Sequence, residues 1–122
     1  MENKKQIGIA ALIDENTVMI NVGFEDDIDE GEVLRVLSKD KITVYDPFTK
    51  EKLADIRKTK AELYVSEVFA NYSYCRSKPY HEPDILNNYI VHEEKLRLKG
   101  EKIGELYTLE PIEVGDPIEF LE

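Results

Sequence analysis

Two histidines and their acidic neighbours suggest a metal site. His81 and His92 are each followed by carboxylates, and imidazole nitrogen with carboxylate oxygen is a common ligand set for zinc. The run His92-Glu93-Glu94 also begins like the His-Glu-x-x-His motif of zinc proteases, but Leu96 occupies the position of the second histidine. A metal centre built from His81, His92 and nearby acids is therefore one hypothesis. Two surface histidines are the interpretation that we favour.

An acid-rich run at residues 25–31 raises the question of calcium binding. If Gly31 takes the sixth position of an EF-hand loop, Ile28 takes the third and Leu37 the twelfth, where oxygen ligands are needed. The run therefore predicts a solvated loop and not a dedicated calcium site.

A catalytic nucleophile is not indicated. Cys75 is the only cysteine, so no intramolecular disulfide can form. It lies in a strand-like run, where a lone cysteine usually serves as a small buried apolar side chain. No serine has the surroundings of a nucleophile elbow, and no Gly-rich phosphate loop is present in the sequence. We accordingly expect neither a catalytic residue nor a cofactor.

Tyrosines in the middle of the chain favour a contact surface, because tyrosine joins a large apolar ring to a polar tip and is enriched at interfaces. The candidates for this surface are six aromatic or imidazole side chains: Tyr72, Tyr74, Tyr80, His81, Tyr89 and His92. Tyrosines in the core and rim of β-structure are an equally good interpretation. Rings could also stack on bases, but no basic groove accompanies them.

Charge restricts the classes of partner. The 122 residues carry 16 Lys and Arg against 26 Asp and Glu, a formal net charge of −10. Such a charge opposes nucleic-acid backbones and anionic membranes. It is also uneven, because eight acids and no base lie between Asp14 and Leu34, whereas bases gather between Lys50 and Lys60. With no signal peptide or membrane span in the sequence, we expect a cytoplasmic protein of one domain, residues 1–122.

Alternation of apolar residues predicts a chain made almost wholly of strands, at residues 7–13, 17–22, 33–38, 42–45, 53–59, 61–77 and 117–121. The apolar side of the long run changes near Ser66-Glu67, which predicts a β-bulge or a sharp bend. Gly23 ends the second strand, and Asp46-Pro47 opens a turn. Residues 78–110 form an insert, with a short helix or a strand after Asp84 and then a hairpin over residues 96–109.

One nine-residue pattern is written twice, as Ile28-Asp-Glu-Gly-Glu-Val-Leu-Arg-Val36 and as Ile112-Glu-Val-Gly-Asp-Pro-Ile-Glu-Phe120. Since glycine tolerates positive φ, Gly31 and Gly115 are expected to turn the chain left-handed just before a strand. The leading isoleucines would anchor in the core, and the acids around each glycine would stay in solvent. Pro117 lacks an N–H and belongs at a strand start or an unpaired edge.

Sheets that bend this often commonly close into small barrels. The predicted fold is thus an all-β small barrel of six to eight mostly antiparallel strands, with an insert at about 78–110.

Six segments share a series of strands and turns: Val18-Met-Ile-Asn-Val-Gly23, Ile28 to Val36, Asp46-Pro-Phe-Thr-Lys-Glu51, Leu63-Tyr-Val-Ser-Glu-Val-Phe69, Ser73-Tyr-Cys-Arg76 and Pro111-Ile-Glu-Val-Gly-Asp116. This series resembles the C-terminal β-barrel domain of the flagellar assembly protein T family and related small barrels. The resemblance covers about half the chain and implies the barrel fold. The chain departs from it by the insert and by lacking the family's other domains and export signal, so the resemblance implies little about flagellar work.

The leading functional hypothesis is a non-catalytic protein-binding or assembly module that recognises protein, including copies of itself, through edge strands and tyrosines. One alternative is a metal-dependent protein or small enzyme that uses His81 and His92. A second alternative is an oligonucleotide-binding barrel.

Overall fold

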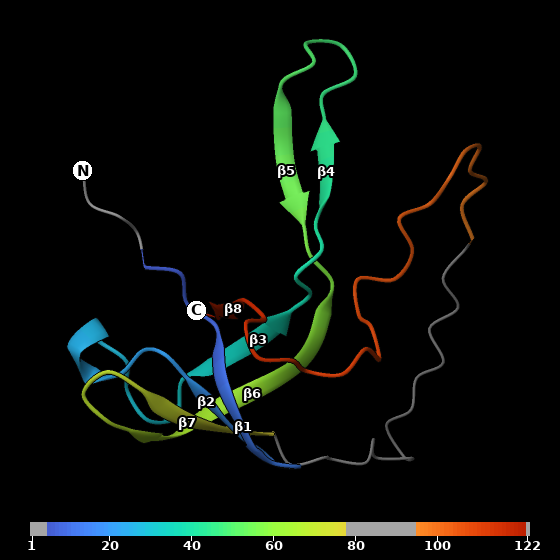
Figure 1. The fold of residues 1–122 in the computed structure, drawn as a ribbon. Coiled ribbons are helices and arrows are strands. Elements are labelled where there is room, and N and C mark those ends of the chain that lie inside the picture. Colours follow the sequence, from blue (N-terminus) through green and yellow to red (C-terminus); the bar gives the residue numbers. More distant parts are fainter. Residues whose placement is uncertain (1–4, 78–94, 122) are drawn as a thin grey trace, which may run out of the picture.

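The computed structural model of the protein describes residues 5–77 and 95–121 (Figure 1). This part contains eight strands and one short 3-10 turn: β1 (Ile9–Asp14), β2 (Thr17–Ile20), η1 (Phe24–Asp26), β3 (Val33–Leu37), β4 (Ile42–Tyr45), β5 (Lys52–Ile56), β6 (Thr59–Val68), β7 (Ser73–Ser77) and β8 (Ile118–Phe120). The all-β prediction is confirmed. The short helix or strand expected after Asp84 lies outside the described residues.

Six of the strands form one curled antiparallel sheet in the order β1-β2-β7-β6-β3-β8. Its two edges meet, because Gly8 bridges Pro117, Ile9 N donates to Asp116 O at 2.9 Å, and Gly115 N donates to Ile9 O at 2.8 Å. A Cβ added to Gly8 would lie 2.5 Å from Asp116 O, so only glycine allows this approach. The predicted small barrel is confirmed, and this meeting of β1 and β8 is called the seam below.

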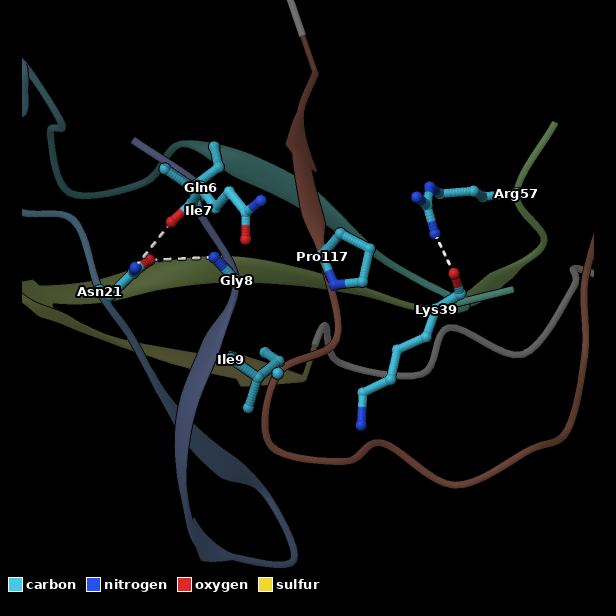
Figure 2. Close-up of a pocket in the computed structure, with 9 residues that line it drawn as sticks. Gln6, Ile7, Gly8, Ile9, Asn21, Lys39, Arg57 and Pro117 are labelled. Carbon is cyan, nitrogen blue, oxygen red and sulfur yellow. Dashed lines mark hydrogen bonds between the residues drawn. The ribbon is translucent and has the colours of Figure 1, made fainter. Parts of the chain in front are cut away.

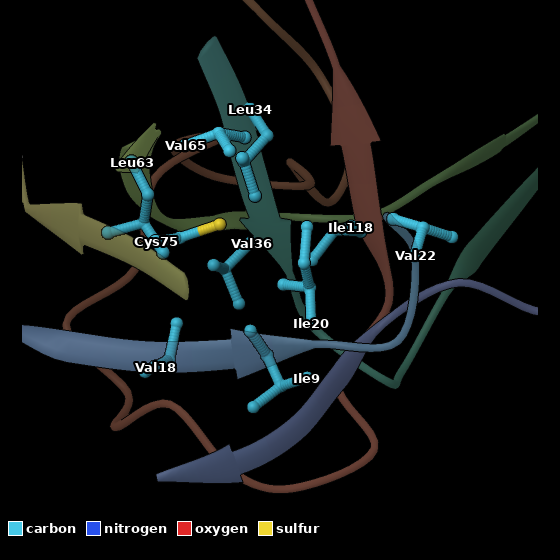
Figure 3. Packing of buried hydrophobic residues seen from close by; sticks show 10 residues of the cluster. All are labelled: Ile9, Val18, Ile20, Val22, Leu34, Val36, Leu63, Val65, Cys75 and Ile118. Atoms are coloured by element: carbon cyan, nitrogen blue, oxygen red, sulfur yellow. The ribbon is translucent and has the colours of Figure 1, made fainter. Parts of the chain in front are cut away.

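The core lies inside the curled sheet, and every barrel strand or its immediate extension contributes to it (Figure 3). Alternate residues of a strand point to opposite faces, so the apolar member of each alternating pair turns inward. Ten buried side chains result: Ile9, Val18, Ile20, Val22, Leu34, Val36, Leu63, Val65, Cys75 and Ile118.

The repeated pattern forms the same structure at both places. Gly31 and Gly115 have φ values of 90° and 91°, and each is the third residue of a four-residue turn, as in type II turns. Gly31 N donates to Val65 O and Val65 N donates to Glu32 O, both at 2.8 Å, so two residues oppose one. Gly115 and the residue after it oppose Ile9 in the same way. Each pattern is therefore a turn followed by a glycine β-bulge.

These two units lead into neighbouring strands. β3 and β8 pair antiparallel, with Leu34 opposite Phe120 and Val36 opposite Ile118. Ile28 and Ile112 pack against the core, as predicted. The sequence predicted that the acids around each glycine stay in solvent. This prediction is wrong for Asp116 in the second unit, because its side chain is wholly buried.

The predicted long strand at 61–77 is two strands. The register of β6 against β7 shifts between Val65 and Glu67, which confirms the bulge. The chain then reverses, with Phe69 N donating to Tyr72 O at 2.9 Å. Alternation missed this reversal because the turn residues 69–72 contain neither Gly nor Pro.

The hairpin expected at 96–109 is also wrong, since residues 95–110 contain no strand of their own. Instead this segment follows the start of β6: Thr59 N donates to Leu106 O at 2.7 Å, and Thr108 N donates to Thr59 O at 3.0 Å. Its leucines alternate like a strand in sequence, but all four of them are exposed.

Strands β4 and β5 form a separate two-stranded sheet, here called the arm (residues 42–56), which projects away from the barrel strands (Figure 1). The predicted Asp46-Pro47 turn makes its tip. Asp46 Oδ1 accepts hydrogen bonds from Phe48 N at 2.7 Å and Thr49 N at 3.1 Å. These bonds lower the pKa of the Asp46 carboxyl.

Candidate functional site

The arm has two chemically different faces. Residues directly opposite each other in an antiparallel pair point to the same side. Ile42 pairs with Ile56 and Val44 pairs with Ala54, so one face of the arm is aliphatic. None of these four side chains is buried.

The other face carries an ion cluster around Asp55. Asp55 Oδ2 lies 2.9 Å from Lys52 Nζ and 3.7 Å from Lys41 Nζ, and Asp55 Oδ1 accepts from Thr43 Oγ1 at 2.7 Å. The hydrogen bond from Lys52, then that from Thr43, lowers the pKa of the Asp55 carboxyl to about 2. The Asp55 carboxylate on this face is therefore neutralised and hydrogen-bonded by neighbouring side chains.

The tip of the arm presents large apolar side chains to solvent. Phe48 is 91% exposed, and Tyr45 and Leu53 are exposed as well. An isolated two-stranded hairpin is marginally stable in water, so a projecting one that keeps an uncovered aliphatic face is unusual in a monomer. The sequence analysis predicted the Asp46-Pro47 turn but did not propose Phe48 as a contact residue. A phenylalanine within a predicted turn was the signal that could have identified it.

Two of the six residues of the candidate tyrosine surface, Tyr72 and Tyr74, belong to the described part of the chain. Tyr72 and Tyr74 lie beside Phe69: the rings of Phe69 and Tyr72 stack with centroids 4.5 Å apart, and Tyr74 meets both edge-on. All three rings are half-buried. Sequence reasoning did not include Phe69, because the turn that brings it to Tyr72 was not predicted. The other four candidates, Tyr80, His81, Tyr89 and His92, lie outside the described residues.

The acid-rich loop at residues 24–32 abuts the turn that carries Phe69. Phe24 N donates to Phe69 O at 2.8 Å, and Glu25 N donates to Ala70 O at 3.0 Å. A Cβ on Gly23 would lie 2.0 Å from Phe69 O, which explains the glycine that immediately precedes this loop. This loop and the aromatic trio are together called the acidic end below.

The acidic end and the arm lie at opposite ends of the barrel. The acidic loop leads into β3 and meets the turn after β6, whereas the arm leaves β3 at its last residue and returns to the first residue of β6. Because β3 and β6 are antiparallel neighbours, their two ends separate the acidic end from the arm (Figure 1).

A cavity of about 540 Å³ lies at the seam (Figure 2). Its lining residues are Gln6, Ile7, Gly8, Ile9, Asn21, Lys39, Arg57, Gly115 and Pro117. Asn21 supports one wall, because its Oδ1 accepts from Gly8 N and its Nδ2 donates to Gln6 O, both at 2.9 Å. Lys39 and Arg57 are the two charged side chains of this lining.

Cys75 and the acid-rich loop belong to the described residues, whereas His81 and His92 do not. Cys75 is fully buried in the core, and burial raises the pKa of its thiol to about 12, as suits a small apolar side chain. The acid-rich loop belongs to the described part of the chain, within which no group of three or more His, Cys, Asp or Glu could hold a metal ion. The hypothesis built on His81 and His92 concerns residues outside that part and stays a prediction.

Comparisons of the chain with protein-family models, with curated proteins and with solved structures found no match. Within residues 5–77 and 95–121, no helix has the length and apolarity needed to cross a bilayer.

Proposed function

We propose that this protein is a non-catalytic protein-binding module that assembles with further copies of itself, and that the arm is its main contact element. The observation that carries the proposal is the uncovered aliphatic face of the arm, with Phe48 91% exposed at the tip. Large aromatic side chains that enter a partner's surface often supply much of the binding energy of an interface.

Charge favours a second copy as the partner. Residues 24–32 carry six acids and no base, whereas residues 39–60 carry seven Lys or Arg against four acids. These regions lie at opposite ends of β3 and β6. Five of these seven bases lie at the base of the arm, in residues 39–41 and 57–60, whereas the arm itself carries two bases and three acids. The base of the arm of one molecule therefore matches the acidic end of another, while a symmetric contact of two acidic ends is repelled.

Contact of unlike ends is a head-to-tail arrangement, which generates rings or open filaments. The aromatic trio at the acidic end offers the apolar area that Phe48 needs. In this arrangement both candidate surfaces, Tyr72 with Tyr74 and the arm, belong to the same interface.

The first test is the oligomeric state of the full chain, measured by sedimentation velocity over a range of concentrations. We expect reversible association whose dissociation constant rises at least about ten-fold in Phe48→Ser, corresponding to about 1.4 kcal/mol. Leu109→Ser removes an equally exposed apolar side chain outside the arm and is the matched control. A wild-type chain that stays monomeric, and that also captures no other protein through the arm, would contradict the proposal.

The second test distinguishes head-to-tail from symmetric contact. Glu25→Lys with Glu30→Lys reverses charge at the acidic end at two exposed positions. Neither this double variant nor Phe48→Ser should form oligomers by itself. An equal mixture should form one-to-one dimers, because the double variant supplies an intact arm and Phe48→Ser supplies an intact acidic end. Self-association of the double variant through its arm alone would refute the head-to-tail arrangement.

The relationship to the C-terminal barrel of flagellar assembly protein T belongs to the proposal at the level of fold. It is supported by the two turn-and-bulge units at Gly31 and Gly115, which occupy segments of the resemblance. A cytoplasmic location is likewise proposed, on the basis of composition.

A further inference from the structure

We propose that the seam cavity is a binding site for a small organic anion, one that carries a carboxylate or phosphate group on a compact apolar body. The cavity volume of about 540 Å³ lies within the range of about 300–1,000 Å³ that is usual for small-molecule sites. The cavity lies outside the arm, although its two cations, Lys39 and Arg57, are among the seven bases of residues 39–60.

Arg57 supplies the recognition group. Its Nη1 donates to Ser38 O at 3.0 Å. The same nitrogen donates to Lys39 O (Figure 2), so both of its N–H groups are used. A guanidinium has five N–H donors, and three therefore remain, on Nε and Nη2. That pair of nitrogens forms one of the forks that bind the two oxygens of a carboxylate or phosphate.

No carboxylate within the described part of the chain neutralises the charge of Arg57. Over residues 5–77 and 95–121, the ion pairs within 4.0 Å do not include Arg57. Their bases are Lys5, Arg35, Lys39, Lys41, Lys52 and Lys60. Two carbonyl oxygens hold the guanidinium in place without cancelling its charge. A cation that is held rigidly and lines a cavity is preorganised for an anion, since little side-chain entropy is lost on binding.

Lys39 supplies a second positive charge on the same cavity. Its Nζ lies 3.2 Å from Glu113 Oε2, and both side chains of this pair are about half exposed. An exposed pair of this kind is weak, so Lys39 can exchange Glu113 for a bound anion at small cost. The side chain passes over Gly115, where a Cβ would lie 3.4 Å from Lys39 Cε.

The remaining walls define the rest of the ligand. Asn21 Oδ1 accepts from Gly8 N and its Nδ2 donates to Gln6 O, which fixes this wall and leaves one N–H of the amide as a further donor. Ile7 and Pro117 contribute apolar surface beside it. The cavity therefore suits an anion with an apolar body better than a sugar or a free inorganic ion.

The experiment is a titration of the full chain, followed through backbone amide NMR signals. The probes are benzoate, phenyl phosphate and inorganic phosphate, with sodium chloride at matched ionic strength as the reference. We expect saturable shifts confined to residues around 6–9, 21, 39, 57 and 115, with benzoate or phenyl phosphate binding at least about five-fold more tightly than phosphate. The ratio of benzoate to phenyl phosphate identifies which anionic group the fork prefers.

Variants connect the binding to the two cations. Arg57→Gln should weaken the tighter probe at least ten-fold, and Lys39→Gln, at an exposed position that the fold does not need, should weaken it about three-fold or more. Lys58→Gln removes the same charge from the adjacent residue, which does not line the cavity, and should change the affinity less than two-fold. If Arg57→Gln changes NMR signals far from the cavity, the effect of Lys39→Gln on probe affinity decides whether the cavity binds the anion.

Three results would overturn the site. They are the absence of saturable shifts with both aromatic anions, equal binding of benzoate and chloride, and affinities that Lys39→Gln and Lys58→Gln lower equally. The last two would mean that the negatively charged probes respond to general surface charge.

Discussion

Lys60 Nζ lies 2.9 Å from Asp116 Oδ2, and both side chains are almost completely withdrawn from solvent, at 5% and 0% exposure. The same Asp116 oxygen accepts from Glu113 N at 2.7 Å, and Lys60 Nζ also donates to Pro111 O at 2.8 Å. One ion pair thus ties the start of β6 to the turn that precedes β8, close to the seam. Within the described chain, Asp116 Oδ1 is buried with no hydrogen-bond partner.

Removing one member of this pair should destabilise the fold strongly. Asp116→Ala leaves the Lys60 ammonium buried without its counter-charge, which typically costs about 3–5 kcal/mol. The exposed pair of Lys39 with Glu113 is the matched control, and Glu113→Ala should cost less than about 1 kcal/mol. Urea unfolding followed by circular dichroism measures both. Equal losses in the two variants would mean that the buried pair is not the tie that its geometry indicates.

Two glycines should respond differently to alanine because they are required for different reasons. At Gly31 no atom lies within 4 Å of an added Cβ, so Gly31→Ala costs only the positive φ, about 1–2 kcal/mol. At Gly8 the Cβ would meet Asp116 O at 2.5 Å and force the seam apart, so Gly8→Ala should cost more than about 3 kcal/mol. Urea midpoints give the comparison, and a Gly8→Ala chain as stable as Gly31→Ala would contradict closure at Gly8.

Asp55 should stay ionised well into the acid range. Its pKa is lowered to about 2 from an ordinary value of 3.8, chiefly by the hydrogen bond from Lys52. Since the folded-state pKa is the lower one, the stabilisation of the arm by this carboxylate is complete above about pH 4 and is lost as pH falls through about 2. Carboxyl carbon shifts in an NMR titration measure the midpoint. Lys52→Met should move that midpoint upward, and an unchanged midpoint would exclude Lys52 as the main cause.

Cys75 should be unreactive in the native protein. Burial raises the pKa of its thiol from an ordinary 9.0 to about 12, and the residue is fully buried. Ellman's reagent at pH 8 should label the native chain only at the rate of unfolding and label one thiol at once in urea. The raised pKa also means that the thiol favours the folded state below pH 9, and that this contribution is lost between about pH 9 and 12. Fast native labelling would show that the core opens at β7.

Local pattern was sufficient for much of the fold. The alternation of apolar residues predicted most strands, because the period of two follows from strand geometry alone. The duplicated pattern predicted both turns, because the preference of glycine for positive φ is a property of a single residue. Pro117 was placed correctly at the start of its strand for a similar reason, its missing N–H.

Most errors and omissions involve partners distant in sequence, and the exception is Phe69, which lies three residues from its ring partner. Phe69 was missed because its ring partner Tyr72 becomes a neighbour only through a turn without Gly or Pro. The cavity at the seam was invisible, since it needs Arg57 beside residues 6–9. Likewise, the sequence predicted an uneven charge but not that the acidic loop and the arm lie at opposite ends of the barrel.

By itself, then, the sequence determined the all-β class, the strand periodicity and the two left-handed turns, since each depends on the conformational preferences of residues a few positions apart. Tertiary structure decided that β1 meets β8, that Asp116 is buried against Lys60, and that the arm projects with Phe48 exposed. The physical reason is that burial and pairing depend on which segments share space. In a curled sheet, the shared space is set by hydrogen bonds between segments that can be more than a hundred residues apart, such as Ile9 and Asp116. Two copies of one sequence pattern can therefore have different surroundings.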